Sequence, residues 1–161
     1  MPRLGRKWRR LSAGMNAPLP EPPILFIDRN SGGRSFRNLL IEQGLKVILH
    51  DEEFPQTAAD EDWLLPVGER GWIVITGDNA TTSSPLFLLR LSKSQTFVFI
   101  LHGLNGASAA DKANCILNAY ESIKRLISER QPPAVWRVGK DGIIREFDFR
   151  RVLVKMRRRK L

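Results

Sequence analysis

The sequence has few of the residue types that build disulfides and nucleophilic sites. It contains one cysteine, Cys115, and two histidines, His50 and His102. A single cysteine excludes an internal disulfide and is typical of proteins in a reducing compartment, so we expect a cytoplasmic location. Cys115 stands in a segment with a helical pattern, where a buried thiol packs as a small hydrophobic residue. No cluster of His, Cys or Ser in the sequence indicates a nucleophile.

Long apolar runs are also missing. No segment approaches the roughly 18 consecutive apolar residues that indicate a membrane-spanning helix, so we expect no membrane partner. Hydrophobic residues nevertheless make up 42% of the chain, which is enough for a packed core and too many for a disordered protein. A length of 161 residues suits one domain and leaves little room for a second.

Acidic residues are absent from both ends of the chain. Residues 1–14 carry five basic side chains and residues 150–161 carry seven, whereas all 17 acidic residues lie between these segments. The net charge of +9 therefore resides in the two ends, and the region between them is slightly acidic. Basic arms attract polyanions, of which a phosphate backbone is the obvious one. A solubilising or disordered tail is the alternative interpretation.

Composition divides the chain into three parts. Residues 1–23 form a basic and Pro-rich N-terminal arm, for which disorder is an open alternative, and residues 24–148 form the domain. Residues 149–161 form a basic C-terminal tail. The first arm is Arg-rich like a targeting peptide but lacks the apolar stretch of a secretory signal. Met15 is an alternative start of translation, which would remove the first basic cluster.

Within the domain, short apolar runs alternate with helical patterns. This alternation predicts an α/β fold, a three-layer α/β/α sandwich with helices on both faces of a central, mostly parallel sheet. The predicted strands are 24–27, 45–49, 72–76 and 96–101, followed by a hairpin of 134–138 and 143–147. The predicted helices are 35–43, a short or distorted one from residue 60, 84–91 and 107–129.

Two of the predicted strands end in aspartate, and a third aspartate begins a helix. Asp28 follows Ile-Leu-Phe-Ile, and Asp78 follows Ile-Val-Ile-Thr-Gly. Because the carboxyl ends of parallel strands share one edge of a sheet, these two side chains should meet there. Asp60 begins the helix that leads into the strand before Asp78, so it should start at the same edge.

Three carboxylates in one crevice repel one another unless a cation lies between them. Oxygen ligands of this kind suit Mg²⁺ or Mn²⁺, which can activate water and stabilise charge on a phosphate. The residues Asp28, Asp60 and Asp78 are therefore the candidate metal ligands and catalytic residues. The alternative is that each aspartate caps a helix or completes a turn, which is a common role for this residue.

The order of these segments resembles the PIN-like domain of VapC-type toxins over about residues 24–138. The resemblance rests on residues 28–40 (DRNSGGRSFRNLL), 44–54 (GLKVILHDEEF), 60–64 (DEDWL) and 68–78 (GERGWIVITGD). It implies a parallel sheet in an α/β/α sandwich and metal-dependent cleavage of RNA. It also implies that the protein is a toxin with RNA as substrate and an antitoxin protein as partner; homo-oligomers remain open.

The resemblance maps the first family acid onto Asp28, the second onto Asp60 and the third, in a Thr-x-Asp motif, onto Asp78. Related sequences often carry Lys or Arg where this chain has Gly77, and many have a fourth acid soon after the third. Here no carboxylate follows until residue 111. A missing oxygen ligand could come from one of three other acids, namely Asp51, Glu61 and Asp62.

Several further residues are candidates for secondary roles. Thr76 could orient a carboxylate or bind a phosphate, and Asn30 and Arg34 could contact a substrate phosphate. For each of them an ordinary strand or loop position is the alternative. His50 and His102 follow strands and could act as bases, but a structural hydrogen bond is the simpler interpretation.

Two other functions compete with the nuclease. A degenerate PIN-like scaffold that binds nucleic acid or protein without catalysis would explain Gly77 and the missing fourth acid. A phosphoacceptor receiver domain also places aspartates at strand ends. It needs an acidic pair beside the first strand and a lysine after the last one, whereas Arg29 follows Asp28 and His102-Gly103 follow the fourth strand.

Overall fold

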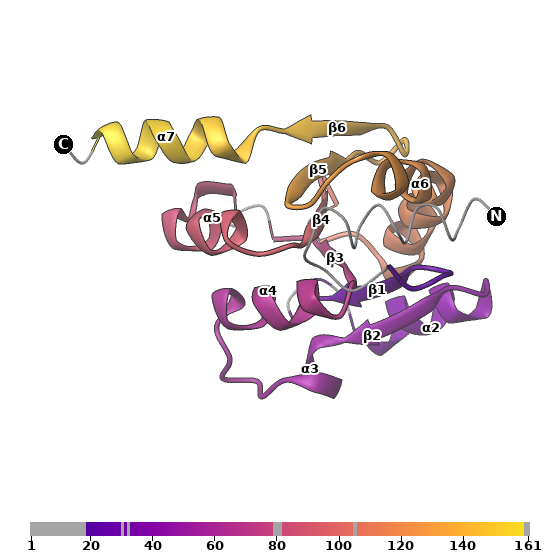
Figure 1. Cartoon of the computed structure of the whole chain (residues 1–161). Coiled ribbons are helices and arrows are strands. Elements are labelled where there is room, and N and C mark those ends of the chain that lie inside the picture. Colours follow the sequence, from indigo (N-terminus) through magenta and orange to yellow (C-terminus); the bar gives the residue numbers. More distant parts are fainter. Residues whose placement is uncertain (1–18, 30, 32, 79–81, 105, 160–161) are drawn as a thin grey trace.

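The computed structural model of the chain describes residues 19–159 except 30, 32, 79–81 and 105, and it leaves out the side chains of Asp60 and Glu61. Most of the N-terminal arm and the candidate residue Asn30 therefore lie outside the described residues. Figure 1 shows the described part as a twisted sheet with helices around it.

A six-stranded sheet forms the middle layer, in the order β2-β1-β3-β4-β5-β6. Its first five strands are parallel, and β6 pairs antiparallel with β5. The strands are β1 (Ile24–Ile27), β2 (Lys46–Leu49), β3 (Ile73–Thr76), β4 (Phe97–Leu101), β5 (Ala134–Val138) and β6 (Ile144–Phe147). The predicted fold class is confirmed, and each strand begins within one residue of its predicted start.

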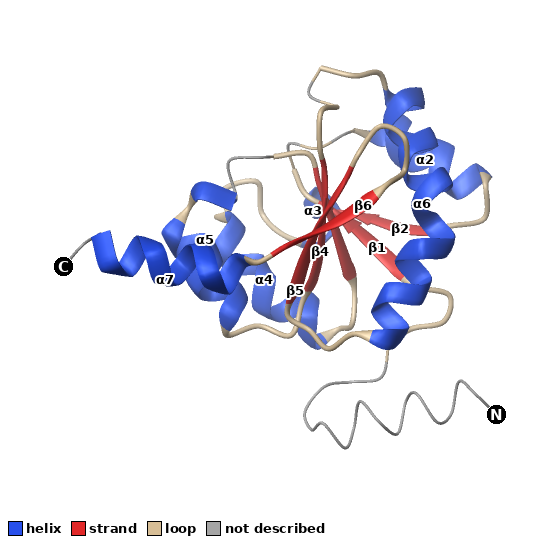
Figure 2. Cartoon of the chain, turned by 90° about the horizontal axis from the view of Figure 1, so that it is seen from above, coloured by secondary structure: helices blue, strands red, loops and turns tan. Residues whose placement is uncertain are grey.

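Helices cover both faces of this sheet, as Figure 2 shows from above. On one face lie α2 (Arg34–Glu42) and α6 (Ala109–Glu129), and on the other lie α4 (Asp60–Glu69), α5 (Pro85–Ser92) and α7 (Phe149–Arg159). A short helix, α3 (His50–Glu53), follows β2 directly. The sequence analysis predicted α2, α4, α5 and α6, but neither α3 nor α7.

The parallel strands send alternate side chains to the two faces because the side-chain period of a strand is two residues. Leu25 and Ile27 of β1 join the core that α2 and α6 cover, whereas Phe26 joins the core beneath α4, α5 and α7. All three side chains are fully buried. Burial on both faces explains why these strands read as continuous apolar runs rather than as alternating ones.

The basic segment at the C-terminus is a helix packed on the domain, which corrects its prediction as a tail. Phe149 and Leu153 of α7 are buried in the core that includes α5, and Met156 packs against that core. Their spacing of four and three residues is that of one helix face. Six of the eleven residues of α7 are basic and dominate its composition, so the apolar face was not recognised from the sequence.

The Pro-rich segment also belongs partly to the folded body. Leu19 is 4% exposed and lies in the core cluster that includes α6, and residues 19–23 line a small cavity with Lys124 and Ile127. The sequence analysis assigned these residues to the basic and Pro-rich N-terminal arm. No helix within the described residues has the length and apolar character that crossing a membrane would require.

Candidate active site

The sheet order brings Asp28 and the Thr76–Asp78 segment together. β1 pairs in parallel with β3, with Ile27 opposite Ile75, and the Asp28 amide donates to the Ile75 carbonyl at 3.3 Å. β2 lies on the other side of β1. The order in which strands are added to the sheet therefore reverses between β1 and β3. In open parallel sheets, ligands bind outside the carboxyl ends of the strands at such a point.

Both oxygens of the Asp28 carboxylate accept hydrogen bonds from hydroxyl groups. The Thr76 hydroxyl donates to Oδ2 at 2.6 Å, and the Ser31 hydroxyl donates to Oδ1. Asp28 is only 3% exposed, and Ser31 and Thr76 are buried beside it. A carboxylate oxygen has two acceptor positions, so each one can accept more than one hydrogen bond.

Backbone amides complete this network. The Gly77 amide donates to Ser31 Oγ at 2.6 Å, and the Asp78 amide donates to Thr76 Oγ1 at 3.1 Å. Each hydroxyl has one proton, which it gives to Asp28, and its oxygen accepts from the loop after β3. The two hydroxyls therefore link the loops after β1 and β3, which places the backbone of Asp78 beside Asp28.

Two residues that the sequence analysis did not select contribute to this arrangement. Ser31 receives and donates the bonds just described, and Lys112 of α6 donates from Nζ to the Ser31 carbonyl at 3.1 Å. A serine three residues after an aspartate is a turn signal that could have indicated Ser31. No local signal could have indicated Lys112, because it lies 81 residues further along the chain.

A crevice of about 320 Å³ opens next to Asp28, at the carboxyl ends of β1 and β2. Three cationic side chains line it, those of Arg29, Arg34 and Arg37, together with Asp28, Asp51 and Glu52. Arg34 is thus placed in the same crevice as Asp28, and Arg29 is held by a hydrogen bond from its guanidinium to the Gln56 carbonyl. The mixture of cations and carboxylates suits a phosphate bound together with a metal ion.

Glu52 is held as an anion at the edge of this crevice. It accepts a hydrogen bond from the Leu49 amide at 2.9 Å and forms an ion pair with Arg37 at 2.8 Å. The backbone hydrogen bond, aided by Arg37, lowers the pKa of the Glu52 carboxyl below its ordinary value. The Glu52 carboxylate therefore holds the Arg37 guanidinium beside the crevice.

The side chains of His50 and Trp63 pack within the domain. His50 is 1% exposed, meets Asp51 Oδ1 at 2.9 Å through Nδ1, and packs against Phe26 and Phe54. Trp63 is buried against Phe26. These contacts agree with the structural interpretation of His50 and with a core role for Trp63.

The predicted ligand Asp60 is placed only by its backbone. It is the first residue of α4, and this helix runs into β3, so its start lies towards the carboxyl edge of the sheet. Without the Asp60 and Glu61 side chains, the described residues contain no group of three or more His, Cys, Asp or Glu side chains that could hold a metal. A site formed by Asp28, Asp60 and Asp78 together therefore remains a prediction.

Comparison with known protein families identifies the fold. Residues 23–103 match the family described as PIN like domain, which covers half of the 161-residue chain. The chain belongs to the PIN-like domain family. The match spans β1 to the end of β4 and therefore includes Asp28, Thr76 and Asp78. No curated protein and no solved structure matches the chain.

PIN-like domains have a nuclease-type fold, and PIN domains are generally nucleases, which are hydrolases. In this PIN-like domain, Asp28 and Asp78 lie on the matched segment and follow β1 and β3, which are parallel neighbours in the sheet. The family match thus agrees with the position of Asp28 beside the loop that carries Asp78.

Proposed function

We propose that this PIN-like domain is a Mg²⁺- or Mn²⁺-dependent endoribonuclease and that it is the toxin of a toxin–antitoxin pair. The observation that carries the proposal is the meeting of Asp28 with the Thr76–Asp78 segment where the sheet order reverses. The Thr76 hydroxyl bonds Asp28 at 2.6 Å and accepts the Asp78 amide at 3.1 Å. This linkage supports a shared site for two acidic positions that lie fifty residues apart in the chain.

Asp28, Asp60 and Asp78 are the residues that would hold the metal, with Asp51 or Glu61 as a further oxygen donor. Their ligand atoms are all carboxylate oxygens, which fits a hard divalent cation. Such an ion would activate water and neutralise charge on the phosphodiester. Ser31 and Thr76 hold Asp28 in a fixed orientation by two hydrogen bonds, so that less reorganisation is needed when substrate binds.

The cations around the crevice give the substrate phosphate a place to bind. Arg34 lines the crevice beside Asp28, and its side chain makes no hydrogen bond or ion pair with another described residue. Its guanidinium can donate two parallel hydrogen bonds to a phosphate. We assign Arg34 and Asn30 to substrate contact, Asn30 on its position in the sequence alone.

The proposal is tested by replacing Asp78 with asparagine, which keeps the shape and removes the charge. We expect Asp78→Asn to lower the rate of RNA cleavage by at least about a hundredfold, because an essential anionic ligand is lost. The circular dichroism spectrum should match that of the wild type. Glu69→Gln is the matched control, since Glu69 is exposed at the end of α4 and at the opposite edge of the sheet. Full metal-dependent cleavage by Asp78→Asn would remove this residue from the site.

The toxin role has its own test. We expect expression of the wild-type chain to arrest bacterial growth and the Asp78→Asn variant to be harmless at the same protein level. Co-expression of a small protein encoded next to this gene should restore growth and should bind the chain directly. Equal arrest by both forms would contradict toxicity through RNA cleavage, even if the purified chain is a nuclease.

A second function, a non-catalytic binding module, is favoured by two observations. Gly77 replaces the basic residue common between the Thr and Asp, and a carboxylate does not follow Asp78 until residue 111. Calorimetry with Mn²⁺ separates the two functions. Binding that is lost in Asp78→Asn supports the nuclease, whereas a wild-type chain that binds neither Mn²⁺ nor Mg²⁺ but retains RNA is a binding module.

A further inference from the structure

A second cavity opens at the same edge of the sheet, beyond β4 and β5. It measures about 460 Å³ and is lined by Gly103, Leu104, Gly106, Ala107, Asp111, Asn114, Cys115 and Lys140. These residues come from three elements, namely the loop after β4, the first turns of α6 and the turn between β5 and β6. We call it the α6 cavity. Its volume falls within the range of sites that bind small molecules.

Several contacts join the segments that line the α6 cavity. The Cys115 thiol donates to the Gly139 carbonyl at 3.2 Å, which ties the β5–β6 turn to α6. A Cβ atom on Gly142 would stand 3.2 Å from the Cβ of Asn118, so this turn lies directly against the helix. The His102 amide also donates to the Val138 carbonyl at 2.8 Å and joins the ends of β4 and β5. These contacts hold the β5–β6 turn and the ends of β4 and β5 beside α6.

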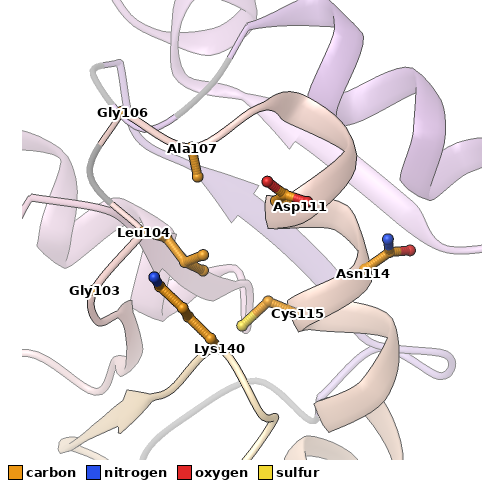
Figure 3. A pocket seen from close by; sticks show the side chains of 8 residues that line it. All are labelled: Gly103, Leu104, Gly106, Ala107, Asp111, Asn114, Cys115 and Lys140. Atoms are coloured by element: carbon orange, nitrogen blue, oxygen red, sulfur yellow. The ribbon is translucent and has the colours of Figure 1, made fainter.

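The polar groups of the α6 cavity are of mixed charge. Figure 3 shows the Lys140 amine and the Asp111 carboxylate on opposite sides of the hollow, whereas the Asn114 side chain points away from Lys140 across α6. The structure gives Lys140 no hydrogen bond or ion pair with other described residues, and its Cε lies 3.8 Å from where a Cβ on Gly103 would be. Burial, together with Asp141, raises the pKa of the Cys115 thiol to about 11, so Cys115 is a neutral wall at ordinary pH.

The α6 cavity adjoins the acidic site through α6. Asp111 lines the cavity, and the next residue, Lys112, donates to the Ser31 carbonyl in the network that holds Asp28. β3, which leads to Asp78, pairs with β4, which leads to Gly103. A strand of substrate with its scissile phosphate at Asp28 and Asp78 would therefore have a neighbouring nucleotide within reach of the cavity.

We propose that the α6 cavity binds an unpaired nucleotide next to the one at the cleavage site, with Lys140 on its phosphate and Asp111 on its base. This assignment rests on the proposed nuclease function. A lysine amine recognises phosphate as a point charge, while a carboxylate accepts hydrogen bonds from the amino groups of a base edge. A base reaches such a hollow only when it is not paired, so the preferred substrate is single-stranded.

The test compares two substrates of the full chain in the presence of Mg²⁺. One is a short single-stranded RNA, and the other is bis(4-nitrophenyl) phosphate, a small diester that has no neighbouring nucleotide. We expect Lys140→Ala to raise the KM for RNA about tenfold with kcat unchanged, because a contact made equally in the ground and transition states is lost. Both constants for the small diester should stay as in the wild type.

Lys46→Ala is the matched control, because it removes the same charge from an exposed residue at the start of β2, on the opposite edge of the sheet. It should change neither substrate's constants. An unchanged KM for RNA in Lys140→Ala, or an equal rise for both substrates, would overturn the assignment while leaving the nuclease function intact.

Failure of the nuclease function is recognised separately, by a wild-type chain that hydrolyses neither substrate. The α6 cavity is then judged by binding alone, from the amide resonances of Gly103, Gly106 and Lys140 during titration with adenosine 5′-monophosphate. Shifts in the wild type that shrink in Lys140→Ala support the assignment, and the absence of shifts overturns it.

Discussion

Two hydroxyl groups hold the central carboxylate of the candidate active site. Ser31 and Thr76 each donate to Asp28 and each accept a backbone amide from the loop after β3. All three side chains are buried, where unpaired polar groups cost far more than in water. Removing either hydroxyl therefore takes one donor from the Asp28 carboxylate and one acceptor from the backbone amide of Gly77 or Asp78.

The first prediction at this scale concerns Ser31→Ala. Loss of the hydroxyl should lower the free energy of unfolding by about 1–3 kcal/mol, since the Gly77 amide loses its acceptor and Asp28 loses a donor. We also expect kcat for RNA cleavage to fall about tenfold, because Asp28 is less firmly oriented. Urea unfolding and single-turnover cleavage measure the two effects.

Ser35→Ala is the matched control for this change. Ser35 is exposed in the first turn of α2 and makes no hydrogen bond with other described residues through its side chain. Its replacement should alter neither stability nor cleavage beyond small effects of helix propensity. If Ser31→Ala behaves like Ser35→Ala in both measurements, the hydroxyl network has no role in the site.

At the scale of elements, α4 is a helix that survives an internal proline. Pro66 lacks the amide that would bond the carbonyl of Asp62, yet the helix extends over ten residues. Trp63, Leu64 and Val67 are all buried in one core, and this packing outweighs the lost bond. The Thr96 hydroxyl adds a bond to the Leu64 carbonyl at 2.9 Å.

Close packing at Gly68 gives a prediction about this helix. A Cβ atom there would stand 2.4 Å from Thr96 Oγ1 and 3.0 Å from the backbone carbon of Gln95. Alanine is normally favoured over glycine inside a helix by up to about 1 kcal/mol, but this clash must displace backbone as well as a side chain. We expect Gly68→Ala to lower the free energy of unfolding by about 1–3 kcal/mol, measured with urea.

The same helix offers a control on its solvent side. Leu65 is 52% exposed, so Leu65→Ala creates no cavity and should change stability by less than about 0.5 kcal/mol. A stabilised Gly68→Ala variant would mean that α4 can move away from the start of β4 at little cost. The shift of α4 would then also move Asp60, whose backbone begins the helix.

Charge is the property that belongs to the whole molecule. The described part of the C-terminal basic segment forms α7, which packs its apolar face on the domain and exposes Arg150, Arg151, Lys155, Arg157, Arg158 and Arg159. The structure gives these six side chains no ion pair with other described residues. A rigid helix with this charge offers a polyanion a fixed row of contacts rather than a diffuse tail.

The prediction at this scale concerns the salt dependence of RNA binding. Replacing Arg157, Arg158 and Arg159 with alanine should weaken binding of single-stranded RNA. The slope of log affinity against log salt should become shallower by about 2, since each phosphate contact to a single strand contributes about 0.7. Fluorescence anisotropy at several salt concentrations measures it.

A triple variant with the same change in net charge is the control. Lys46, Arg125 and Arg145 are exposed, lie on other elements, and make no ion pair with described residues through their side chains. Alanine at these three positions should change the slope much less. Equal slopes for the two triple variants would show that overall charge, rather than α7, attracts RNA.

The sequence by itself determined the local elements and the acidic positions. Short apolar runs and helical patterns with a period of 3.6 residues depend on near neighbours in the chain. Six strands and four helices could therefore be predicted within a few residues. Asp28, Thr76 and Asp78 could also be selected, because each stands at or just after the end of a buried strand. The hidden apolar face of α7 shows the limit, since its basic residues outnumber the positions that pack.

Only the tertiary structure decided which residues meet. The order β2-β1-β3 placed Thr76 against Asp28, brought Ser31 under the loop after β3, and set Lys112 on the Ser31 carbonyl. The α6 cavity likewise needs three segments that are distant in the chain. Strand order and such contacts follow from the free energy of packing the whole chain. Burial of both faces of the sheet depends on all strands and helices together, so no short segment of the sequence determines it.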